Sequence, residues 1–155
     1  MKRYLFFLLI SPFFTGPVFP SPGPSVAVMV NVSGRGAAAC GVREEGLKNI
    51  AGFVLNSAKI RRVEPNGVAN GLLINTVTSF DSGIRSCHAG VSVELFGFSQ
   101  SDLQNAPFNG FQSPLRKTVL CSELGVQIAP MGTFPGELSR LTEELIKECL
   151  GRLKY

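Results

Sequence analysis

Four cysteines, widely spaced in the sequence, constrain this 155-residue chain more than any other feature. Cys40, Cys87, Cys121 and Cys149 form an even set, and none of them lies within 20 residues of another. Zinc sites usually bring their ligands in close pairs such as C-x2-C, so this spacing favours disulfide bonds over a metal site. Because disulfides persist in oxidising compartments, the cysteines predict a protein that is exported.

The N-terminal segment also indicates export. Lys2 and Arg3 precede an almost wholly apolar run over residues 4–14, which is the pattern of a secretory signal peptide. The run is shorter than the ~20 apolar residues that a spanning helix needs, so we expect no stable membrane span. We predict a signal peptide and Pro-rich spacer over residues 1–24 and a single periplasmic or secreted domain over residues 25–155.

Charge excludes one class of partner. The formal net charge falls from +4 to +2 once Lys2 and Arg3 are lost, and the remaining basic residues are scattered along the chain. Nucleic-acid-binding domains carry a basic stripe or patch on one face. We therefore expect no nucleic-acid partner.

Hydrophobic patterns predict an α+β fold. In one segment Val91, Val93 and Leu95 alternate with Ser92 and Glu94, as in a strand with one buried face. Apolar residues at helical spacing predict helices elsewhere. Strands are predicted over residues 26–32, 72–80, 89–98 and 115–128, and helices over 42–59 and from 133 onward. This β-α-β-β-β-α order predicts a two-layer sandwich with two helices on one face of a mostly antiparallel four-stranded sheet.

The predicted topology selects a pairing of the cysteines. Spacing alone allows three pairings of four cysteines. A crossover helix makes the first two strands parallel, and the later strands alternate in direction. Cys40 and Cys87 then share one end of the sheet, and Cys121 and Cys149 share the other. The expected bridges are Cys40–Cys87 and Cys121–Cys149.

No motif predicts a cofactor. Residues 34–39 match G-x-G-x-x-A between a strand and a helix, the dinucleotide fingerprint in outline. That fingerprint also needs an acidic residue about 20 residues further on, and the nearest acid in a comparable place, Asp81, is too distant. We interpret the segment as a flexible turn and expect no cofactor and no metal.

The chain has a single histidine, His88. Its neighbour Cys87 cannot easily pair with it, because adjacent side chains of a strand point to opposite faces. We expect no catalytic site and a non-enzymatic protein. The alternative hypothesis is a small hydrolase-like enzyme centred on His88, assisted by Glu94 or Asp81.

A 16-residue loop over residues 99–114 is the clearest candidate for binding, since loops of this length are often functional. It contains Phe108, Asn109 and Phe111. Its aromatic residues are either an anchor packed beneath the loop or an exposed contact patch. We predict Phe108, Asn109 and Phe111 as binding residues.

The stretch CHAGVSVEL over residues 87–95, following LINTV over residues 73–77, resembles a group of small uncharacterised exported bacterial proteins. The resemblance implies a signal peptide and one α+β domain, and it implies no activity. The sequence as a whole predicts an exported, disulfide-stabilised, non-enzymatic domain. It would bind a protein or envelope partner through the 99–114 loop or the open polar face of the sheet.

Overall fold

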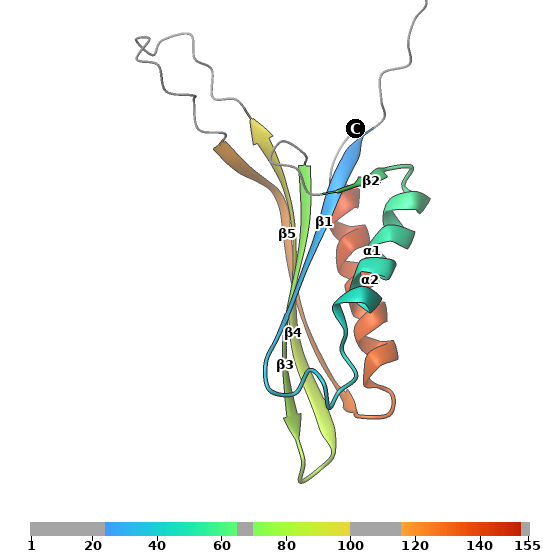
Figure 1. The fold of residues 1–155 in the computed structure, drawn as a ribbon, viewed down its shortest axis with the longest axis vertical. Helices are drawn as coiled ribbons and strands as arrows, with labels where there is room; N and C mark the ends of the chain where they lie inside the picture. Colours follow the sequence, from blue (N-terminus) through green and yellow to red (C-terminus); the bar gives the residue numbers. More distant parts are fainter. Residues whose placement is uncertain (1–23, 65–69, 100–115, 153–155) are drawn as a thin grey trace, which may run out of the picture.

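The fold is α+β, with one sheet and two helices. The computed structural model describes residues 24–64, 70–99 and 116–152. Both helices lie on the same side of the sheet (Figure 1). The elements in chain order are β1 (Ser25–Ser33), α1 (Glu44–Ser57), β2 (Arg61–Val63), β3 (Asn70–Asp81), β4 (Ser86–Ser99), β5 (Arg116–Pro130) and α2 (Phe134–Arg152).

The sheet has five strands, where four were predicted, in the order β2-β1-β3-β4-β5. It is mixed, because β1 pairs in parallel with both β2 and β3, whereas β3, β4 and β5 are antiparallel. The additional strand is β2, in a segment expected to be the end of a helix and a turn. A strand of three residues that begins with two arginines gives no apolar alternation from which it could be predicted.

The chain enters β2 because α1 ends early. The helix stops at Ser57, and Lys59 adopts a left-handed backbone with φ of 58°. Ile60 is then buried, which brings the following residues alongside β1. The end of the helix is thus set by burial of Ile60, which the helical pattern through residue 59 does not reveal.

The core lies between the two helices and one face of the sheet, here called the covered face. The predicted apolar stripe of α1 supplies Leu47, Ala51, Val54 and Leu55 to it, all buried. Acidic residues in the first turn of α1 complement the positive end of the helix dipole. Burial on the sheet side confirms the predicted alternation in β4, where Val91, Val93 and Leu95 are buried. The opposite side of the sheet is called the open face.

Two disulfides fasten the covered face. Cys40, in the loop before α1, is bonded to Cys87 on β4, and Cys121 on β5 is bonded to Cys149 on α2. All four cysteines are buried. These are the two pairs that the strand directions predict. Two such bridges fit a domain stabilised for an oxidising compartment.

Candidate binding surface

His88 stands apart from Glu94, one of the two acids that were paired with it in the enzyme hypothesis. It lies half-buried on β4, between Ser79 and Ile128 in the neighbouring strands. Its Nε2 has no hydrogen-bond partner within the described residues. Glu94 is six residues further along the same strand, roughly 20 Å away, and forms an ion pair with Lys117. The two groups are therefore too far apart along the strand to act together.

Asp81 has a structural role in the turn after β3. Its carboxylate accepts a hydrogen bond from the backbone N–H of Gly83 over 2.9 Å, which stabilises the turn. No group of three possible metal ligands occurs among residues 24–64, 70–99 and 116–152. The arrangement of His88, Glu94 and Asp81 gives the hydrolase hypothesis no support.

The glycines of the G-x-G-x-x-A segment serve packing. A Cβ built on Gly34 or Gly36 would lie within 3.0 Å of the backbone of β3, near Thr78 and Ser79 respectively. Gly34 also has a positive φ of 98°, which favours glycine. This loop is therefore pressed against the sheet, and the glycines explain the motif without a phosphate ligand.

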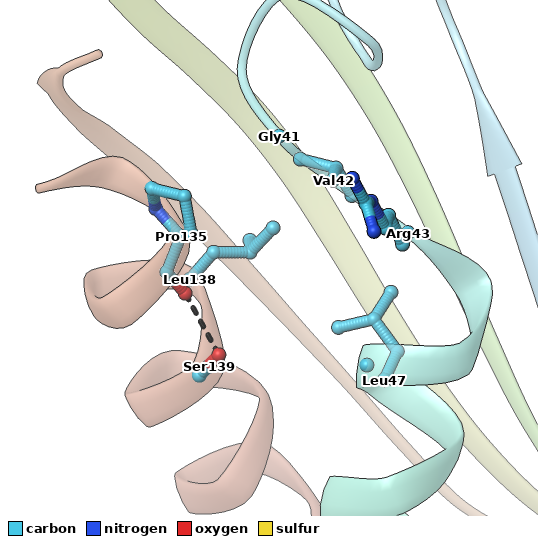
Figure 2. A pocket seen from close by; sticks show the side chains of 8 residues that line it. Gly41, Val42, Arg43, Leu47, Pro135, Leu138 and Ser139 are labelled. Carbon is cyan, nitrogen blue, oxygen red and sulfur yellow. Dashed lines mark hydrogen bonds between the residues drawn. The ribbon is translucent and has the colours of Figure 1, made fainter. Parts of the chain in front are cut away.

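A small cavity lies where α1 and α2 begin (Figure 2), at a place that no sequence motif marks. Its volume is about 170 Å³, below the ~300 Å³ at which ligand pockets usually start. Arg43 is its single charged lining residue; the others are Gly41, Val42, Gly46, Leu47, Pro135, Leu138 and Ser139. The cavity is too small to hold a typical organic ligand.

The open face carries an unexpected group of exposed apolar side chains. Val77 is on β3, and Leu124, Val126 and Ile128 are on β5, with exposed fractions between 60% and 75%. We call these four residues the apolar patch. They lie in adjacent rows of the sheet, with Gly90 between Val77 and Val126. The prediction of a polar open face is therefore wrong where these four residues lie.

In β5 the large apolar residues of the alternation face solvent, which is the reverse of the usual arrangement in a strand with one buried face. The helices are faced by Cys121, Gly125 and Ala129, which are small, and by Glu123 and Gln127, whereas bulky apolar residues face outward. Gly125 lies beneath α2, where an added Cβ would be 2.9 Å from a methyl carbon of Leu141. Cys121 is bonded to α2 through Cys149. At Gly125 α2 lies so close to β5 that no larger side chain fits between them. The alternation at residues 124, 126 and 128 was visible in the sequence, but the direction in which it points was not.

At the other end of the open face the ring of Phe96 is covered, although Val119 opposite it is 50% exposed. Phe96 is 5% exposed, and its ring lies over Gly71 in the neighbouring strand, where an added Cβ would collide with it. The Lys117 ammonium lies 4.2 Å from the centre of this ring and forms an ion pair with Glu94. The aromatic group at this end is thus covered, whereas the apolar patch is not.

The predicted binding residues Phe108, Asn109 and Phe111 lie outside the described residues, as do residues 1–23 of the predicted signal peptide. Neither helix of the part that is described is both long enough and apolar enough to cross a membrane.

No protein-family model matches the chain. The curated proteins likewise include no similar sequence. Among solved structures the chain is similar to a PelC dodecamer from Paraburkholderia phytofirmans, with 13% identity over 91% of this chain and 96% of that one and a TM-score of 0.44. It is also similar to a rare lipoprotein B from Shewanella oneidensis, with 12% identity over 81% and 90% and a TM-score of 0.28. Likenesses at this level carry no inference about function.

Proposed function

We propose that this chain is an exported, non-enzymatic domain that binds a protein or envelope partner through the open face of its sheet. The apolar patch is the observation that carries the proposal. Exposed apolar side chains that form a contiguous patch on a soluble domain mark interaction sites, whereas scattered single ones need no explanation. The proposal also retains Phe108, Asn109 and Phe111 as contact residues of the 99–114 segment.

Export is supported by the two disulfides, since cytosolic thiols are kept reduced. When cells of the native host are lysed in denaturant with an alkylating agent, all four cysteines should stay unmodified until a reductant is added. Mass spectrometry reads this directly. Four alkylated cysteines before reduction would contradict export.

Binding through the open face is tested with a photo-cross-linking amino acid in place of Val77. This residue lies on an inner strand and is 61% exposed. The matched control places the same group at Glu148, which is exposed on α2. Cross-linking in cells is expected to give an adduct with a second protein or an envelope component from position 77 only. Equal yields at both positions, or none at 77, would overturn the proposal.

A further inference from the structure

We propose that β5 pairs edge to edge with β5 of a second copy of this chain, antiparallel and about a twofold axis beside Val126. The inference goes beyond the proposed function, because it names a contact at the outer edge of β5 and leaves the open face free for the partner proposed above. Within the described residues β5 is the last strand of the sheet, and no other strand pairs with its outer edge. The argument depends on where the backbone groups and side chains of this strand point.

A hydrogen bond at the end of the strand sets the direction of its backbone groups. The N–H of Met131 donates to the carbonyl of Arg85 over 3.1 Å, one step beyond the pair Ser86 and Pro130. Hydrogen-bonded and non-hydrogen-bonded pairs alternate in an antiparallel ladder. The odd-numbered residues from 121 to 131 therefore face β4, and the even-numbered residues from 122 to 130 direct their backbone groups outward.

Two further observations agree with this direction. Pro130 has no N–H and occupies one of the outward positions, where no ladder bond is lost. The side-chain amide of Gln127 donates to the carbonyl of Ile128 over 3.3 Å, which is accessible because it points away from β4. The outer edge of β5 is thus a row of backbone donors and acceptors.

The same even-numbered residues carry the apolar patch, since Leu124, Val126 and Ile128 are exposed on the open face. A fitting partner must therefore be an extended strand with apolar side chains on one face. β5 satisfies both conditions toward itself, because antiparallel pairing is symmetric about a twofold axis. With Val126 opposite its own copy, Leu124 of each chain lies opposite Ile128 of the other.

Charge is compatible with this register. Glu123 is the single charged residue between residues 122 and 130, and it would face Ala129 of the second copy. Its carboxylate is already bonded to Arg152 of its own chain over 2.7 Å. No like charges are brought together. The register that would place Glu123 opposite Glu123 of the second copy is disfavoured, because the two like charges repel.

Natural edge strands are usually protected by lysines, prolines or bulges. In β5 the bulge beside Leu120 and Pro130 stand at the two ends of the segment from 122 to 130, Lys117 lies before the bulge, and Glu123 is the one charged residue within the segment. The opposite edge of the sheet is β2, which has three residues and exposes Arg61 and Arg62. Of the two edges formed by the described residues, β5 is the one that no described segment covers and that remains available for pairing.

The size of the contact predicts a reversible dimer. A segment of nine residues spans about 30 Å, and pairing along such an edge buries less than the ~800 Å² per partner of a typical stable interface. We therefore expect the average mass of the purified chain in sedimentation equilibrium to rise with concentration from one chain toward two.

A cysteine placed at the axis tests the geometry. Opposite residues of a hydrogen-bonded pair are about 5.5 Å apart at Cα, within the range that a disulfide spans. Val126→Cys is expected to form a covalent dimer on oxidation. Val77→Cys, exposed to a similar degree but on an inner strand, is the control and should not. Mixing Leu124→Cys with Ile128→Cys chains should link them to each other more than either links to itself.

A backbone variant tests the edge itself. Val126→Pro removes an outward N–H and no bond to β4, so it should abolish the concentration-dependent rise in mass. Val126→Lys, which adds the charge that natural edges use, should do the same if the proline variant fails to fold. The inference is overturned if the wild-type chain keeps the mass of a monomer throughout, or if Val126→Cys links no faster than Val77→Cys. An adduct from position 77 with a different protein would still uphold the proposed function.

Discussion

Two neighbouring rows of β4 and β5 each pair a valine with a glycine, but the strand that carries the valine differs between the rows. On the covered face Val91 of β4 is paired with Gly125 of β5, and on the open face Gly90 of β4 is paired with Val126 of β5. Val91 is fully buried, whereas Val126 is 68% exposed. The comparison shows that contact with α2 limits residue size on the covered face of β5, because α2 lies directly on Gly125.

The largest expected effect comes from the bridges beneath the helices. Replacing Cys121 and Cys149 together by alanine should lower the free energy of unfolding by about 2–5 kcal/mol, and replacing Cys40 and Cys87 should cost about 0.5 kcal/mol more. The reason is loop length, since the two bridges span 28 and 47 residues. Urea unfolding of both double variants beside the wild type measures this. Unchanged midpoints would contradict a structural role for the bridges.

A matched valine pair compares the two faces directly. Val91→Ala should cost about 2 kcal/mol, because it removes two buried methyl groups and leaves a cavity. Val77→Ala, at a position 61% exposed, should change stability by less than about 0.5 kcal/mol. Thermal and urea unfolding read both changes. Equal losses at the two positions would show that the open face is covered in solution.

A matched glycine pair sharpens the same comparison. Gly125→Ala should cost about 1 kcal/mol, because its methyl group would press on Leu141 and force the helix outward. Gly90→Ala meets nothing within 4 Å and should leave stability unchanged or raise it by about 0.5 kcal/mol. The difference in urea midpoint between the variants is the measurement. A stabilising Gly125→Ala would disprove the close contact between α2 and β5.

The smallest expected effect lies at the Phe96 end of the open face. Lys117→Gln removes the ion pair with Glu94 and the contact over Phe96, and should cost at most about 1 kcal/mol because both charged groups are partly exposed. The loss should shrink as salt is added, since salt screens exposed charges. Unfolding at low and high ionic strength tests this. A large, salt-independent loss would mean that Lys117 acts mainly by packing.

Much of the fold could be predicted from the sequence, because most of its elements bury one face. The alternation through Val91, Val93 and Leu95 predicted the buried face of β4, and helical spacing predicted the stripe of α1. The strand β2 could not be predicted, since Arg61 and Arg62 carry no such pattern and pair only because β1 lies beside them. The apolar patch was missed for a related reason: its residues look like core residues.

The sequence by itself determined the order of most elements, the helices and the pairing of the cysteines, because each follows from local periodicity and strand direction. Only the tertiary structure decided which face of β5 is buried. The physical reason is distance: α2 packs against β5 where Gly125 and the Cys121–Cys149 bridge allow close approach. That contact turns Leu124, Val126 and Ile128 toward solvent and creates the surface on which the proposed function rests.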